Sequence, residues 1–124
     1  MIPDFSNMTK PKQPLRVIIS VDIEIWPHNW DMSHVELNRC FKKFIHGETA
    51  FGDYGLRFQL EQLKQHNLKG VFFVESLFSG HYGIEPLQEI VAQIHEAGQE
   101  VQLHLHTEWL GKGRFQNKLN KIGN

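Results

Sequence analysis

Three short apolar runs along the chain have the length and composition of β-strands. Residues 16–22 and 70–75 are rich in β-branched and aromatic side chains, which is typical of buried strands. Residues 100–106 instead alternate apolar and polar positions, which is the period of a strand with one covered face. The stretches between these runs are long enough to hold helices.

Two helices are predicted between the strands, because apolar residues recur there at spacings of three and four. The first covers residues 53–66, with Asp53 as its candidate N-cap. The second covers residues 85–97, with Pro86 in its first turn and Gly98 as its stop. Strands that alternate with helices in this way predict an α/β fold with parallel strands and right-handed crossovers.

The stretch between the first strand and the first of these helices has a weaker pattern. Residues 26–52 are long for a connection, and long ordered loops are usually functional. A short helix is predicted around residues 33–43, because Ser33 and Glu36 have the spacing of a capping box. We expect the rest of this stretch to be irregular.

Composition and charge are those of one globular domain. The chain has 124 residues, of which 40% are hydrophobic and 22% charged, so we predict a single domain over residues 15–110. Residues 1–14 are predicted to be a flexible leader, and residues 111–124 a basic loop or frayed tail. The net charge of -1 argues against nucleic acid or an anionic membrane as partner. Without a visible signal peptide or membrane span, we predict a cytoplasmic protein.

Candidate chemistry gathers where the first and third predicted strands end. The first ends with Asp22 and Glu24, and the third with His104 and His106. Residues two apart on a strand share a face, so the carboxylates and imidazoles can converge at the carboxyl edge of a parallel sheet. Such donors suit Zn²⁺, Mn²⁺, Fe²⁺ or Co²⁺. An ion of this kind polarises a carbonyl and activates water, and a spare carboxylate can be the general base.

Four further residues lie near these motifs. Glu75 ends the second strand and is predicted to be solvated, while Glu108 follows His104 by four positions and is a candidate further ligand. Trp26 and Trp109 flank the motifs and are candidate platforms for a sugar ring. Each residue also has an ordinary explanation as a strand end, loop surface or local packing. Their combination at equivalent strand ends favours a site.

Three segments resemble motifs of the polysaccharide deacetylase superfamily, the relatives of carbohydrate esterase family four. Residues 17–26 (VIISVDIEIW) resemble its first motif, in the branch with Asp-x-Glu in place of Asp-Asp. Residues 70–74 (GVFFV) resemble its second strand, and residues 95–109 (HEAGQEVQLHLHTEW) resemble its helix, glycine turn and histidine motif. The likeness runs from about residue 15 to 110, and three motifs in order make it fairly specific.

The resemblance implies a fold, a cofactor and a reaction. The fold would be part of a distorted (β/α)7 deacetylase-type barrel, with about three parallel strands and their covering helices in this chain. The cofactor would be a divalent metal ion. The reaction would be hydrolysis of an amide, typically the N-deacetylation of an acetylated sugar or polysaccharide, although some members act on amides of other small molecules.

The resemblance also implies roles for individual residues. Asp22 matches the general base, Glu24 lies near the metal-binding carboxylate, and His104 matches the first metal histidine. The second histidine of the family follows four positions later, where this chain has Glu108. Either His106 replaces it, or the metal is bound differently or has been lost.

The family domain contains later strands and motifs that residues 110–124 are too short to hold. We therefore expect a truncated hydrolase, active or inactive as this chain, with either marginal stability alone or self-association through the incomplete barrel. The alternative is a non-catalytic remnant or protein-interaction module on a partial deacetylase fold, which would take up no metal. A flavodoxin-like binding domain is disfavoured, because no Gly-rich phosphate loop follows the first strand.

Overall fold

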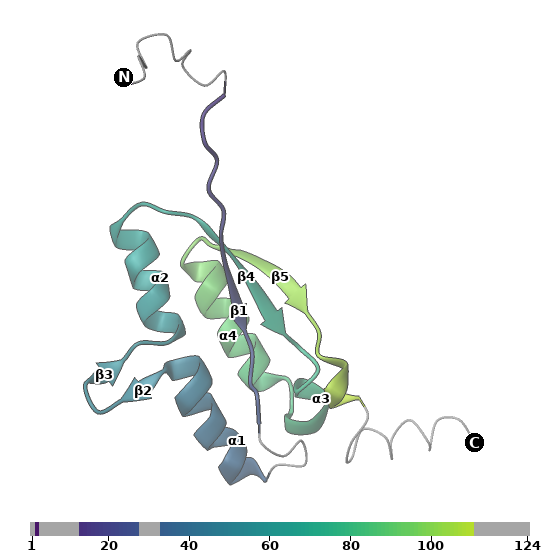
Figure 1. Ribbon diagram of the computed structural model, residues 1–124. Helices are drawn as coiled ribbons and strands as arrows, with labels where there is room; N and C mark the ends of the chain where they lie inside the picture. The colour runs from purple at the N-terminus through teal and green to yellow at the C-terminus, as the bar shows by residue number, and fades with distance from the viewer. Residues whose placement is uncertain (1, 3–12, 28–32, 111–124) are drawn as a thin grey trace.

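The chain folds around a parallel sheet with helices beside it (Figure 1). The computed structural model describes residue 2, residues 13–27 and residues 33–110. In spatial order, the sheet consists of β1 (Ile19–Ile23), β4 (Gly70–Glu75) and β5 (Glu100–His104). The predicted α/β class with parallel strands is confirmed. No helix of the described residues is long and apolar enough to cross a membrane.

The two faces of this sheet differ in burial. Ile23 of β1 is in register with Val74 of β4, and both side chains are buried. On the opposite face, Asp22, Phe73 and Gln102 form one row across the three strands. Asp22 and Gln102 are exposed, and Phe73 is half-buried. One face therefore packs against the core, and the other carries the polar residues of the strands.

The core face packs against the two crossover helices, α2 (Leu56–Gln65) and α4 (Glu85–Glu96). Figure 1 shows α4 behind the strands and α2 to the side of β1. Both helices contribute leucine or isoleucine side chains to the buried cluster around Phe72. The predicted second helix is confirmed to within one residue, with Pro86 in its first turn. Gly98 follows it with a φ of 70°, a left-handed conformation that glycine adopts without a Cβ clash.

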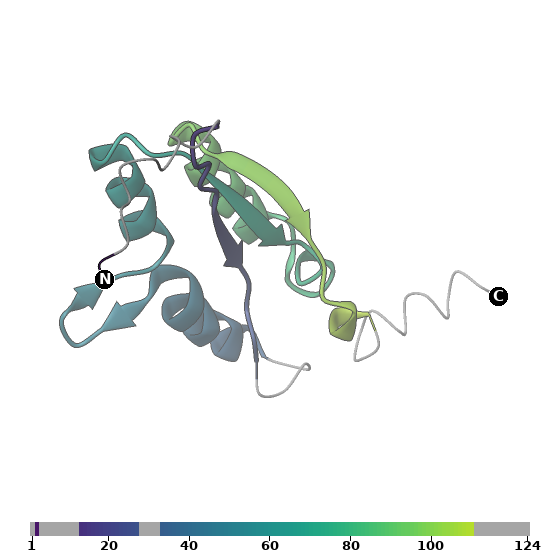
Figure 2. The ribbon, with the colours of Figure 1, turned by 45° about the horizontal axis from the view of Figure 1, so that its top comes forward.

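The stretch predicted to be mostly irregular is more ordered than expected. The capping box is confirmed, because Ser33 Oγ accepts from the Glu36 N–H at 3.3 Å and Glu36 Oε2 accepts from the Ser33 N–H at 2.8 Å. The elements that follow are α1 (His34–Cys40), the π-helix η1 (Phe41–His46) and the short hairpin of β2 (Glu48–Thr49) and β3 (Gly52–Asp53). Figure 2 shows α1, this hairpin and α2 grouped beside β1.

The start of α2 corrects the prediction that Asp53 caps it. Asp53 instead belongs to β3, and Gly55 is the residue before the helix, with no side-chain cap. The Gly55 N–H donates to the carbonyl of His46 at 2.9 Å. A Cβ atom on Gly55 would lie 2.1 Å from the carbonyl oxygen of Ile45, so this close approach requires glycine. The backbone contact moves the helix start to Leu56.

The outer strands are shorter than predicted. β1 begins at Ile19 because its partner β4 begins at Gly70, which faces Ile19 in the register. Beyond the carboxyl edge lie two short helices, α3 (Ser79–Tyr82) after β4 and the 3-10 helix η2 (Thr107–Trp109) after β5. The predictions of a leader and a basic tail fall almost entirely on residues outside the described ones.

Candidate metal centre

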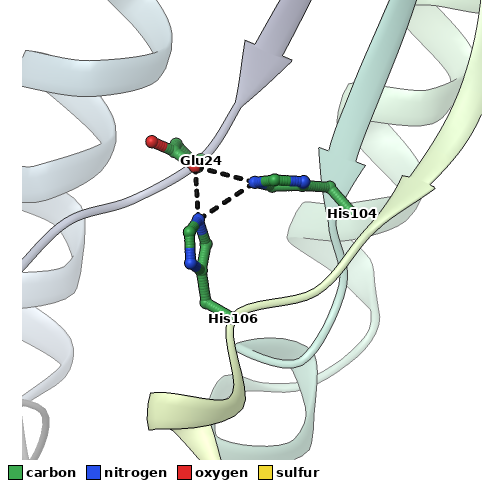
Figure 3. Close-up of side chains that lie close together, drawn as sticks. All are labelled: Glu24, His104 and His106. Atoms are coloured by element: carbon green, nitrogen blue, oxygen red, sulfur yellow. Dashed lines mark hydrogen bonds and ion pairs between the residues drawn. The ribbon is translucent and has the colours of Figure 1, made fainter.

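Three side chains converge at the carboxyl edge of the sheet (Figure 3). Oε2 of Glu24 lies 3.0 Å from Nε2 of His104 and 2.5 Å from Nε2 of His106. The two Nε2 atoms are 3.0 Å apart. All three residues are half-buried. The structure thus brings together three of the four residues predicted as metal ligands, although Glu24 and His104 are 80 positions apart in the chain.

Parallel pairing explains this convergence. Glu24 follows the last residue of β1, and His104 is the last residue of β5. Both flank Glu75, the last residue of the central strand β4, which faces His104 in the register. Because side chains alternate along strands, these positions share the face that lies away from the core. His106 lies beyond the end of β5, and its ring meets the His104 ring at 90° with a centroid distance of 4.6 Å.

The three donor atoms fit a divalent transition-metal ion. Two imidazoles and one carboxylate are ligands that Zn²⁺, Mn²⁺, Fe²⁺ and Co²⁺ accept. Donors held at about 2.0–2.2 Å from one ion at near-right angles lie roughly 3 Å apart. The two separations from His104 Nε2, 3.0 Å each, match that value, and the separation between Glu24 Oε2 and His106 Nε2, 2.5 Å, is shorter. Three protein ligands would also leave a coordination position for water or substrate.

The same three residues are coupled electrostatically. Desolvation is the largest single influence on Glu24 and raises its pKa, but the hydrogen bonds and charges of His106 and His104 together outweigh it, so the pKa is lowered. For His106, too, desolvation is the largest single influence, and by itself it would lower the pKa. The hydrogen bond to Glu24 and the charges of Glu24, Glu75 and Glu108 outweigh that influence, so the pKa of His106 is raised.

Two more of the predicted site residues lie next to this group. Asp22 precedes Glu24 by two positions on β1, so it shares the same sheet face, and it is exposed. Trp26 is 46% exposed, and its ring meets the ring of His106 edge-on at a centroid distance of 4.8 Å. Both side chains are accessible at the edge of the sheet where the donors converge.

The other two predicted residues do not join the site in the expected way. Glu108 does not belong to the ligand group: its Oε2 lies 3.9 Å from Nδ1 of His106, the ring nitrogen that faces away from Glu24. Trp109 is only 1% exposed. It packs in the core against Phe78 and His81, so it does not offer the open ring face that a sugar platform requires.

The structural place of Glu75 beside the site was missed from the sequence. Glu75 was predicted to be solvated, and this is wrong: it is fully buried, and both of its oxygens accept from backbone N–H groups. One feature of the sequence could have indicated its burial: Glu75 ends the central strand, between the strands that carry the two motifs.

No protein-family model, curated protein or solved structure matches the chain. What the chain does must therefore be argued from the arrangement of its own residues and from the motifs that they form.

Proposed function

We propose that the chain binds a divalent metal ion through Glu24, His104 and His106 and hydrolyses an amide bond at that ion. The observation that carries the proposal is the convergence of one carboxylate oxygen and two Nε2 atoms, all within 4.8 Å of one another, at the carboxyl edge of a parallel sheet. Active sites of α/β folds form at this edge. The donors also come from the two motifs that resemble the deacetylase superfamily.

The side chains around the donors support hydrolysis. A bound ion would supply polarisation of a carbonyl and activation of water. Asp22 is exposed on the same sheet face and is the candidate general base, which would take a proton from water attacking the carbonyl. Trp26 is the candidate to pack against a sugar ring, because its exposed ring borders His106.

The motif resemblance narrows the proposed substrate to an acetylated sugar or polysaccharide, or another acetylated small molecule. The proposed fold is part of a deacetylase-type barrel. Three parallel strands, with α2 and α4 on one face and the site residues on the other, are compatible with a segment of a barrel wall.

Metal binding is tested with untagged protein. Elemental analysis and calorimetric titration with Zn²⁺, Mn²⁺ and Co²⁺ should give one ion per chain for the wild type. The substitution His104→Ala should weaken binding by at least about 100-fold, because a direct ligand matters at least as much as its outer partners. His95→Ala is the matched control, since His95 is an exposed histidine on α4. Wild-type protein that takes up no ion would rule the proposal out.

Turnover is tested separately with the metal-loaded protein. Acetate release from N-acetylated oligosaccharides should be detectable for the wild type. Asp22→Asn should retain the metal and lose about 10²- to 10⁴-fold in rate, the usual contribution of a general base. Binding of metal with no release of acetate from these substrates would contradict the proposed hydrolysis, whereas the absence of both metal and turnover would favour the alternative, a non-catalytic interaction module.

A further inference from the structure

The hydrogen-bond ladder between β4 and β5 ends in an unusual way beside the site. The Ser76 N–H donates to the carbonyl of His104 at 3.3 Å, so the next donor in the parallel pattern is the N–H of His106. Its regular acceptor would be the carbonyl of Ser76. That oxygen instead accepts from the N–H of Ser79 at 3.1 Å and from Ser79 Oγ at 2.7 Å, where the chain turns into α3. The N–H of His106 donates to Oε2 of Glu75, at 2.5 Å.

Glu75 thus takes the place of a main-chain acceptor at the point where the ladder stops. Its side chain is 0% exposed, and its other oxygen accepts from the N–H of Leu77 at 2.6 Å. It stands between the two strands that lead to Glu24 and His104, yet it does not belong to the group of potential ligands. Both oxygens point to backbone N–H groups and not toward the three potential metal ligands.

We propose that Glu75 is a positioning residue: it holds the backbone of His106 so that the imidazole meets Glu24 and His104. This inference rests on the proposed metal site. A buried N–H must find an acceptor, and a carboxylate gives a stronger hydrogen bond than a neutral group. Holding the backbone N–H restricts where the Cα of His106 can lie, and the side-chain torsions then place Nε2. Outer partners of metal ligands typically contribute 10- to 100-fold in affinity.

The test compares Glu75→Gln with Gln99→Met in the full chain, by calorimetric titration with Zn²⁺. Glutamine keeps the shape of Glu75 but places an N–H₂ group against one of the two backbone donors. It should bind Zn²⁺ about 10- to 100-fold more weakly than wild type. Gln99 is the matched control, because it is the other buried polar side chain in the described residues and it also bonds to the backbone. Its replacement should leave the affinity of the folded protein unchanged.

A second measurement needs no metal. The His106 amide should be protected from hydrogen exchange in the wild type, and Glu75→Gln should shift its resonance and reduce the protection. If Glu75→Gln does not fold, Glu75→Asp retains the charge with a shorter reach and should show the same losses. Equal Zn²⁺ affinity in folded Glu75→Gln and wild type, or an unprotected His106 amide, would overturn the role of Glu75. Failure of wild type to bind any ion would instead overturn the metal site, and with it this positioning role.

Discussion

Two polar side chains are buried in the described part of the chain, and they lie at opposite ends of the central strand β4. At the amino end, Gln99 accepts from the N–H of Gly70 at 2.9 Å and donates to the carbonyl of Leu68 at 3.4 Å. At the carboxyl end, Glu75 accepts from two backbone N–H groups and donates to none. An amide both donates and accepts, whereas a carboxylate only accepts.

The difference indicates what each end of the sheet is built for. Burial of a carboxylate carries a larger desolvation penalty than burial of an amide. Gln99 demonstrates that a neutral group is enough to connect loops to the amino end of β4. The more costly group stands beside Glu24, His104 and His106, where its charge also favours a cation. The amino end is therefore a structural junction, and we propose that the carboxyl end is the place of chemistry.

The largest change in stability should come from a substitution in the middle of β4, between its two ends. Phe72→Ala should destabilise the fold by about 3–5 kcal/mol, because the side chain is fully buried and a cavity would remain. Urea unfolding measures this loss. Leu103→Ala on β5 is the control, since Leu103 is 66% exposed and should change stability by about 0.5 kcal/mol or less. Similar losses in the two variants would mean that β4 is not the centre of the core.

The next prediction compares the two ends of the sheet by their influence on Zn²⁺ affinity. Glu24→Gln should weaken Zn²⁺ binding by at least about 100-fold, or about 2.8 kcal/mol, because the only carboxylate of the ligand group loses its charge. Glu100→Gln is the control, as Glu100 is an exposed carboxylate at the amino end of β5. Calorimetric titration gives both affinities. If both substitutions weakened binding equally, the effect would come from overall charge and not from the site.

A smaller effect is expected at the amino end. Gln99→Met should lower the free energy of unfolding by about 1–3 kcal/mol, because the N–H of Gly70 loses its acceptor in a buried position. Chemical denaturation of metal-free protein measures it. A change in Zn²⁺ affinity of the folded protein would contradict the separation of the two ends.

The pH dependence of Zn²⁺ affinity should report on the carboxyl end of the sheet and not on the amino end. A metal ion competes with the proton on His106, whose pKa is raised above its usual value of 6.5. The release of this one proton should therefore make Zn²⁺ affinity rise with pH by about tenfold per pH unit below that raised pKa, and this contribution should level off above it. Titrations between about pH 5 and 8 give the profile. An affinity independent of pH over this range would exclude His106 as a ligand.

In the metal-free protein, the contribution of His106 to stability should fall as the pH rises, whereas Zn²⁺ affinity rises. Because the pKa of His106 is raised, its contribution to stability is complete below 6.5 and is lost as the pH rises through the raised value. Because the pKa of Glu24 is lowered, its contribution is complete above 4.5 and is lost as the pH falls through the lowered value. The stability difference between wild type and Glu24→Gln should thus be largest between 4.5 and 6.5. Denaturation curves that differ equally at every pH would contradict this coupling.

Local patterns in the sequence predicted much of the framework. The second strand was predicted over the same residues that form β4, and the capping box of Ser33 and Glu36 is present as expected. The alternation of side chains also predicted that Asp22 and Glu24 would share one face of their strand, and that His104 and His106 would do so on theirs. These features depend on the period of a strand or on the reach of a side chain across one helical turn, both of which are local.

Other features depend on what distant segments bring to a residue. Asp53 has the right identity for a helix cap, but the hairpin and the close packing of Gly55 moved the helix start. Glu108 follows His104 at the spacing of the family's second histidine, and Trp109 flanks the motif. In the structure, however, Glu108 lies beside Nδ1 of His106 and Trp109 is buried in the core. The sequence by itself determined the order of strands and helices, the capping box of Ser33 and Glu36, and the donor types. Only the tertiary structure decided which donors meet and that Glu75 is buried, because both depend on the packing of segments far apart in the chain.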